Sequence, residues 1–225
     1  MRRKIFEIGG FVAAAILIAF GITAIVMGVN GRHTVSTSLQ NEYIVGSSDM
    51  TPTAIKAEAK QAGITKFVTE WPSTSVAGAK IDTGSRARAF AQYMRIHTLE
   101  ASGGLTYAQM GRYQALPTAP KSATDGAGGT NDTKFAATDP KTKQPVSNGR
   151  RDLWVTETAL TTALNTSYMA DQLGLFGIVV GIALLLSGIG FAVLAVGGTL
   201  RNAEPALKLF GARTPKAAGK AIPTA

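Results

Sequence analysis

Two long runs of apolar residues dominate the pattern of hydrophobic and polar positions along the chain. The first run extends from Ile8 to Val29 and the second from Leu173 to Leu200, and neither contains a charged residue. At a rise of 1.5 Å per residue, a helix over the first run is roughly 33 Å long, which is enough to cross the hydrocarbon core of a bilayer. Because the backbone in lipid must satisfy its own hydrogen bonds, both runs are predicted to be transmembrane helices.

The first run also has features of a secretory signal peptide, since Arg2, Arg3 and Lys4 form a basic region in front of it. However, the hydrophobic region of a signal peptide is only about 7–15 residues long, and a cleavage sequence of small residues normally follows it. Here the apolar run is longer, and the chain continues as Met27-Gly-Val-Asn-Gly-Arg32. We therefore expect a retained signal-anchor helix rather than a cleaved leader.

Basic residues close to the apolar runs predict the topology, because they favour the cytoplasmic side of a membrane. They are frequent in segment 2–4 and in the tail 201–225, whereas Arg32 is the nearest basic residue on the inner sides of the two runs. We expect a cell-membrane protein with two transmembrane spans, over residues 8–29 and 173–200. Residues 1–7 and the basic tail 201–225 are expected in the cytoplasm, and residues 30–172 form an extracytoplasmic domain.

The formal net charge of +9 would also suit a protein that binds nucleic acid. Acidic residues nearly balance the basic ones in the segment between the two runs, so that the excess positive charge lies mainly near the membrane ends. Such a distribution indicates topology and attraction to anionic lipid headgroups rather than a surface for phosphates. The expected partners are the lipid bilayer and other membrane proteins or a second copy of the chain, and no nucleic acid.

The pattern after the first membrane run predicts short strands and a short helix. β-branched residues over 34–45 favour a strand, although Leu39 and Tyr43 are four residues apart and would also fit a helix. A short helix is expected over 53–62 and a second strand over 65–71.

The strongest helix of the outer segment is predicted over Asp82–Ala101. Its apolar positions follow helical spacing, Asp82 or Thr83 can cap its first turn, and Gly103-Gly104 ends it. The sequence Thr106-Tyr-Ala-Gln109 resembles a capping box and predicts another short helix over 107–113.

The last part of the outer segment combines a polar stretch with a long helical pattern. Residues 117–148 are rich in Pro, Gly, Thr, Asp and Lys, and they are predicted to form a mobile loop because they offer little apolar area to bury. From Arg151 the pattern is helical and continues into the second membrane run, so this helix should extend outward with its apolar stripe covered by the 82–101 helix. The expected fold is a mainly α membrane protein with two transmembrane helices and a large extracytoplasmic α(+β) insertion.

The residues that usually carry chemistry are few. Cysteine is absent and histidine occurs only at His33 and His97, which excludes disulfides, thiolate metal sites and cysteine nucleophiles. No Gly-x-Ser-x-Gly sequence and no phosphate-binding loop occurs. The remaining metal set combines both histidines with Glu100 or Glu42, but His33 is expected at the membrane surface. We therefore predict no catalytic residue, no cofactor and no metal ligand, and we expect that the protein is not an enzyme.

Two stretches resemble a known family. They read Ala89-Phe-Ala-Gln-Tyr-Met-Arg-Ile-His97, followed by Gly103-Gly-Leu-Thr-Tyr-Ala-Gln-Met-Gly111, and Arg151-Asp-Leu-Trp-Val-Thr-Glu-Thr-Ala-Leu-Thr-Thr-Ala-Leu164. The sequence is similar here to actinobacterial two-span membrane proteins of unknown function, some of which are labelled aromatic ring-opening dioxygenase. The resemblance implies an actinobacterial envelope protein. It contains no catalytic motif, and the iron of an extradiol dioxygenase would require two histidines and a carboxylate.

Small residues at four-residue spacing in both membrane runs predict close helix packing, either within the chain or between chains. These positions are Gly10, Ala14, Ala24 and Gly28 in the first run and Gly177, Gly181, Ala183 and Ser187 in the second. The candidate partner contacts on the outward extension are Trp154, Leu160, Leu164 and Tyr168. These packing signals favour a non-catalytic accessory, assembly or scaffold subunit of a membrane complex. The alternative is an extracytoplasmic ligand-binding or sensing module that uses region 34–113.

Overall fold

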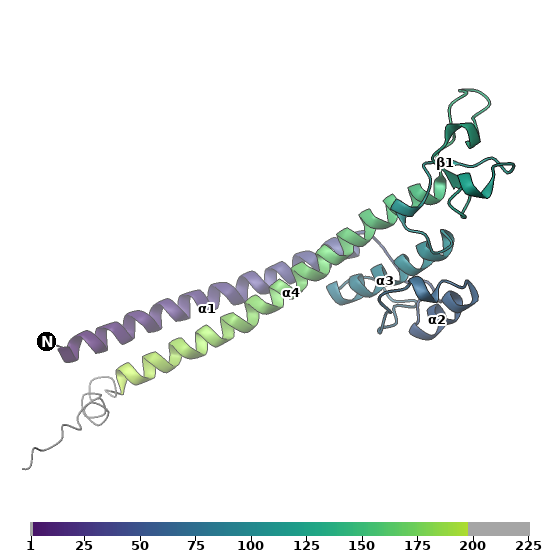
Figure 1. Ribbon diagram of the computed structural model, residues 1–225. Helices are drawn as coiled ribbons and strands as arrows, with labels where there is room; N and C mark the ends of the chain where they lie inside the picture. The colour runs from purple at the N-terminus through teal and green to yellow at the C-terminus, as the bar shows by residue number, and fades with distance from the viewer. Residues whose placement is uncertain (1, 198–225) are drawn as a thin grey trace, which may run out of the picture. The chain divides into compact units, whose positions relative to one another are not determined.

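The structure is a computed structural model that describes residues 2–197, with side chains from residue 7 onward. The described part of the protein is mainly helical (Figure 1). The α-helices of the described chain are α1 (Arg2–Asn41), α2 (Pro52–Gln61), α3 (Gly84–Ala101) and α4 (Gly149–Val196). Two short strands, β1 (Tyr113–Gln114) and β2 (Gly129–Thr130), pair antiparallel. The 3-10 helices among the described residues are η1 (Thr65–Phe67), η2 (Tyr107–Gln109), η3 (Lys121–Ala123) and η4 (Thr133–Phe135).

The chain divides into two compact units, and α1 and α4 each contribute to both of them. One unit comprises Met1–Met27 with Gly177–Ala225, of which residues 2–27 and 177–197 are described. We call it the helix-pair unit, and we call the other, Gly28–Phe176, the insertion unit. Both helices contain a stretch long and apolar enough to cross a membrane, with a mean hydropathy of 2.6.

Glycines bring α1 and α4 into close antiparallel contact in the helix-pair unit. A Cβ added to Gly181 would lie 2.7 Å from the Gly21 carbonyl oxygen, and one added to Gly188 would lie 3.0 Å from the Ala14 carbonyl oxygen. The two contacts lie seven residues apart on each helix, which is two helical turns. Larger side chains would separate the backbones, so glycine is needed at these crossings.

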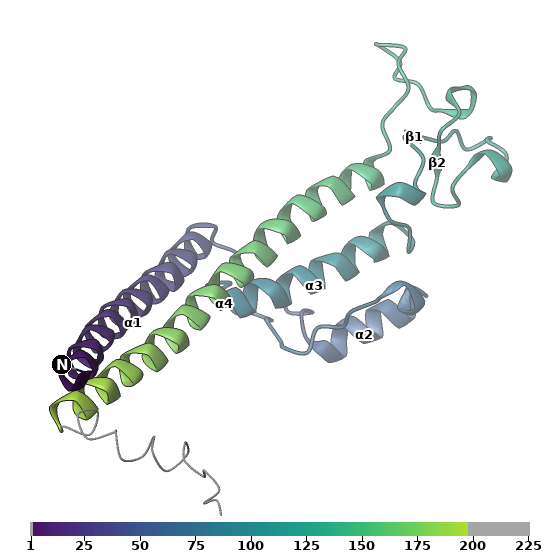
Figure 2. The same ribbon diagram turned by 60° about the vertical axis from the view of Figure 1, so that its left-hand side comes forward.

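The core of the insertion unit forms around α3, which lies between α2 and the first half of α4 (Figure 2). The hydroxyl of Thr83 accepts a hydrogen bond from the Arg86 N–H and caps the first turn of α3, and Gly103 follows its end with a φ of 65°. Both broad faces of α3 are buried, because α2 covers one and α4 the other. The buried core residues of α3 are Ala87, Ala89, Phe90, Ala91, Tyr93, Ile96 and Leu99.

The structure confirms three of the helices predicted for the outer segment, with bounds that differ by a few residues. The helix expected over 53–62 is α2, with Pro52 in its first turn and the Thr51 hydroxyl as its cap. The helix expected over 82–101 is α3. The helix expected from Arg151 continues without interruption into the second apolar run as α4, and residues 198–200 of that run lie outside the described residues.

The strand predicted over 34–45 is wrong, because α1 continues as a helix to Asn41. Leu39 is buried in the insertion core and Val35 packs against it, four residues before, so tertiary packing favours the helix despite the β-branched composition. Val45 keeps only an isolated bridge with Lys80.

Two further predictions are corrected at short elements. Segment 65–71 is not a strand, because no neighbouring strand pairs with it in the described chain; its start is η1, and Val68 and Trp71 pack on the core. The helix expected over 107–113 is only the single turn η2. The Gln109 side chain accepts a hydrogen bond from the Thr106 N–H at 2.8 Å, as the capping pattern predicted, but Tyr113 already belongs to β1.

Segment 117–148 is mainly irregular, but it is organised by local hydrogen bonds. It contains η3, η4 and β2, and the Asp125 carboxylate accepts N–H groups from Gly111, Ala127 and Gly129 at 2.7–2.8 Å. Whether the segment is mobile stays a prediction. The predicted orientation of the termini is also untested, and the basic tail 201–225 lies outside the described residues.

Candidate functional site

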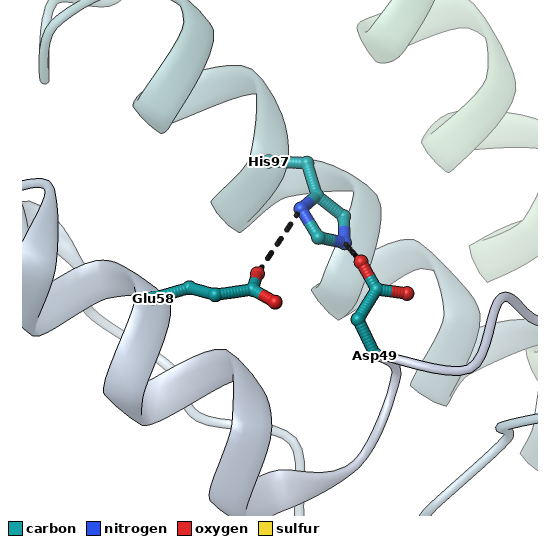
Figure 3. Close-up of side chains that lie close together, drawn as sticks. All are labelled: Asp49, Glu58 and His97. Atoms are coloured by element: carbon teal, nitrogen blue, oxygen red, sulfur yellow. Dashed lines mark ion pairs between the residues drawn. The ribbon is translucent and has the colours of Figure 1, made fainter.

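The side chains of Asp49, Glu58 and His97 meet at one edge of the insertion core (Figure 3). Asp49 stands in the turn before α2, Glu58 lies on α2 and His97 lies on α3. Their positions follow from the core, because the neighbouring residues Met50, Ala59 and Ile96 are buried there. Packing of α2 against α3 therefore brings together three polar side chains that are distant in the sequence.

The imidazole of His97 lies between the two carboxylates (Figure 3). Its Nε2 atom is 3.5 Å from Asp49 Oδ2, and its Nδ1 atom is 3.8 Å from Glu58 Oε2. All three side chains are partly exposed. These distances are longer than a hydrogen bond between such atoms, so the imidazole is close to both carboxylates without a direct hydrogen bond to either.

The orientation of Asp49 is fixed by its other oxygen. The Ser47 hydroxyl donates a hydrogen bond to Asp49 Oδ1, which leaves Oδ2 directed toward His97. This hydrogen bond is the main cause that holds the pKa of Asp49 below its usual range; partial burial raises that pKa, and the neighbouring His97 lowers it. Asp49 is therefore a carboxylate at neutral pH.

His97 Nε2 is buried and has no hydrogen-bond partner among the residues that the structure describes. Buried polar nitrogens are rarely left without a partner, so this atom needs an explanation. Within residues 2–197, the cluster is also the one set of three metal-ligating side chains whose ligand atoms all lie within 4.8 Å of one another.

The structure does not bring together the metal set considered from the sequence. His33 is exposed on α1, Glu42 is exposed just after α1, and Glu100 is exposed on α3. Only His97 of that set belongs to the cluster. The carboxylates that do approach His97 could not be identified from local spacing, because they lie 48 and 39 positions away in the sequence and meet it through tertiary packing.

The candidate partner contacts on α4 pack instead against α3 in the same unit. Trp154 and Leu164 are buried in the core, and Leu160 packs against it. The Trp154 indole N–H donates to the Leu105 carbonyl at 2.9 Å, and the Arg88 guanidinium stacks 5.2 Å from the centre of the Tyr168 ring. Packing within the chain therefore accounts for the apolar stripe on α4, as the covering by the 82–101 helix predicted.

Glu157 is a buried carboxylate on α4, close to Arg95 of α3. It is not among the candidate residues identified from the sequence. Burial raises its pKa, and this effect outweighs the opposing influence of Arg95 and of the hydroxyls of Thr158 and Thr161. Its Oε1 atom has no hydrogen-bond partner within the described chain. Glu157 is seven residues before Leu164, so heptad spacing along α4 predicts its burial.

A second acidic group, Asp171, joins α1 and α3 to α4. The carboxylate is mostly buried and accepts a hydrogen bond from Arg32 Nε at 2.9 Å. Gly84, at the start of α3, lies directly against it, since a Cβ there would be 2.6 Å from Asp171 Cβ. This contact fixes three helices at the point where both apolar runs end.

The predicted helix-packing positions fall into two groups. Gly10, Ala14, Gly28 and Gly181 are buried, and Ala24 and Gly177 are partly buried. Ala183 and Ser187 are exposed, and the Ser187 hydroxyl donates to the Ala183 carbonyl at 2.8 Å within α4. The first group includes the α1–α4 contacts of this chain, and the second does not.

Comparison with protein-family models, with curated proteins and with solved structures gives no match to this chain.

Proposed function

We propose that the protein is a non-catalytic, membrane-anchored envelope protein that acts through protein contacts, as an accessory, assembly or scaffold subunit of a membrane complex. The two long apolar helices support the anchoring role. Their apolar side chains are widely exposed; Phe20 is 65% exposed and Leu186 is 63% exposed. Exposed apolar surface of this extent suits lipid or another membrane helix.

One observation carries the proposed role in protein contacts. Ala183 and Ser187 stay exposed, whereas Gly181 and Gly188 of the same helix are buried against α1. Gly190 continues the exposed group, since an added Cβ would meet nothing within 4 Å in the described chain. Small residues at this spacing allow another helix to approach closely, and α1 does not use them.

The absence of cysteine from the chain permits a direct test by single-cysteine cross-linking. Ser187→Cys would carry a short photoactivatable cross-linker in native membranes. The matched control is Ile189→Cys, which is also exposed but lies about 200° around the helix from position 187. We expect a protein adduct from Ser187→Cys and lipid adducts alone from Ile189→Cys. Equal protein cross-linking at the two positions, or none at either, would contradict the proposal.

The alternative role, an extracytoplasmic ligand-binding or sensing module, is favoured by a different observation. Asp49, Glu58 and His97 form a polar cluster within the region 34–113 that was assigned to ligand binding from the sequence. A ligand of the insertion unit that raises its melting temperature would support this role. Such a ligand would not by itself exclude a scaffold role, because the cluster and the exposed face of α4 are separate features.

A further inference from the structure

We propose that Asp49, Glu58 and His97 bind one divalent metal ion of the zinc type, which joins the turn before α2, α2 itself and α3. The proposal rests on the side chains of the insertion unit and is independent of the role proposed for the membrane helices.

The donor set selects the class of metal. One imidazole nitrogen and two carboxylate oxygens are common ligands of Zn²⁺. Mg²⁺ and Ca²⁺ prefer oxygen ligands throughout, whereas imidazole favours zinc and the later transition metals. Three protein ligands leave at least one position for water, which agrees with the partial exposure of the cluster.

The spacing of the donor atoms is close to what such an ion requires. Zinc–ligand bonds of about 2.0–2.1 Å in tetrahedral geometry place neighbouring ligand atoms about 3.3–3.4 Å apart. The Asp49 Oδ2 atom is already 3.5 Å from His97 Nε2, and all three donors lie within 4.8 Å. Glu58 Oε2 lies 3.8 Å from His97 Nδ1, the other nitrogen of the ring, so the Glu58 side chain must rotate toward Nε2 to join the same ion. Glu58 is partly exposed on α2, so this rotation needs no displacement of the helix.

Two details prepare the site for a cation. The hydrogen bond from Ser47 occupies Asp49 Oδ1 and directs Oδ2 toward His97, which is the outer-shell support that metal-binding carboxylates usually have. His97 Nε2 is buried and lacks a hydrogen-bond partner in residues 2–197, so a metal ion would satisfy it. A simple ion pair would explain the nearby carboxylates, but it would leave Nε2 without a hydrogen bond.

The expected consequence of binding is mechanical. Asp49 belongs to the turn before α2, in which the Met50 N–H donates to the Ser47 carbonyl at 3.1 Å and the Met50 carbonyl accepts the Val76 N–H at 3.1 Å. An ion bound to Asp49 and to both helices would link this turn directly to α2 and α3 and would oppose separation of the two helices. A ligand that binds only the folded chain raises its melting temperature.

The test uses the full-length protein in detergent, purified without a polyhistidine tag, stripped with EDTA and desalted. Titration with ZnCl₂ is followed by calorimetry, by metal content and by thermal unfolding. We expect one Zn²⁺ per chain and a rise in melting temperature of several degrees. His97→Gln and Glu58→Gln should each weaken binding roughly ten-fold or more, and Ser47→Ala should weaken it by roughly ten-fold through the orientation of Asp49.

The matched control is Glu100→Gln, which removes an exposed carboxylate from α3 outside the cluster and should leave binding unchanged. Helical content measured by circular dichroism identifies any variant that fails to fold, and Glu58→Gln, at a partly exposed position, then carries the test. The proposal is overturned if the wild-type protein shows no saturable zinc binding. It is equally overturned if both ligand variants bind as the control does, or if Ca²⁺ binds in preference to Zn²⁺.

Discussion

The helix-pair unit and the insertion unit use opposite means to hold the same helix, α4. In the helix-pair unit, α4 contacts α1 through glycine, so that backbone lies against backbone at Gly181 and Gly188. In the insertion unit, α4 contacts α3 through large side chains such as Trp154 and Leu164. The difference follows the expected surroundings. Lipid offers no gain for burying apolar side chains, so close backbone packing must hold helices together, whereas in water apolar burial is the dominant stabilising term.

The two units also differ in the polarity of the residues that α4 buries. Asp171, which pairs with Arg32, and Glu157 lie on α4 within the insertion unit. The buried α4 positions described for the helix-pair unit, Gly181, Gly188 and Ala195, carry no charge. A buried charge costs much free energy unless it is paired, and this cost is greatest where water is absent.

Trp154→Ala should have the largest effect, because it removes the largest side chain from the α3–α4 seam. Loss of a buried aromatic side chain costs about 3–5 kcal/mol of unfolding free energy. Trp154→Phe keeps most of the volume and loses the hydrogen bond to the Leu105 carbonyl, so it should cost about 1–2 kcal/mol. Denaturant unfolding in detergent measures both. If the two substitutions lower the unfolding free energy equally, apolar packing of Trp154 is not what stabilises the contact between α3 and α4.

Gly21→Leu should separate α1 from α4 in the helix-pair unit. A Cβ at Gly21 would already lie 2.7 Å from the Leu185 backbone nitrogen, so the substitution forces the backbones apart, at a cost of about 1–3 kcal/mol. Gly9→Leu is the matched control on the same helix, since its Cβ would meet nothing within 4 Å in the described chain. Thermal unfolding in detergent should distinguish them, and equal melting temperatures would contradict close packing at Gly21.

Asp125→Ala should destabilise the loop around β1 and β2, because three N–H groups lose their shared acceptor, at a cost of about 1–3 kcal/mol. Burial raises the pKa of Asp125, but the three N–H groups outweigh it and the pKa lies below its usual value. The stabilisation is therefore present above the unfolded pKa of about 3.9 and is lost as the pH falls through the lower folded pKa. Hydrogen exchange of the Gly129 amide, compared at pH 6 and pH 3 after correction for intrinsic rates, measures the effect. Unchanged protection in the variant would disprove it.

Glu157→Gln should change the stability least, and it should stabilise the protein at neutral pH, whereas the other three substitutions destabilise it. Burial raises the pKa of Glu157 in the folded chain, so the folded state binds the proton more tightly than the unfolded state does. The wild-type protein should therefore gain stability from Glu157 as the pH falls toward its folded pKa, and lose it as the pH rises. Glutamine avoids the cost of the buried charge at neutral pH. A melting temperature at pH 7 below that of the wild type would show that the charge pairs favourably with Arg95.

The helices could be predicted from sequence to the extent that their packing is periodic. The spacing on α3 reflects its burial against α2 and α4, and the charge-free runs of α1 and α4 reflect the lipid expected around them. The pattern over 34–41 is ambiguous, because its β-branched residues favour a strand. Only packing of this segment against the insertion core stabilises it as a helix. The His97 cluster was out of reach for another reason. Its carboxylates come from separate elements, and nothing in the local sequence of Asp49 or Glu58 indicates their common neighbour.

The topology predicted from the sequence places residues 30–172 outside the cytoplasm and both termini inside it. It is tested most directly by labelling single cysteines in intact cells with a membrane-impermeant maleimide, since the chain has no cysteine of its own. Ser122→Cys, in the insertion, should be labelled in intact cells, and Ala218→Cys, in the tail, only after permeabilisation. Labelling of Ala218→Cys in intact cells, or protection of Ser122→Cys, would contradict the account.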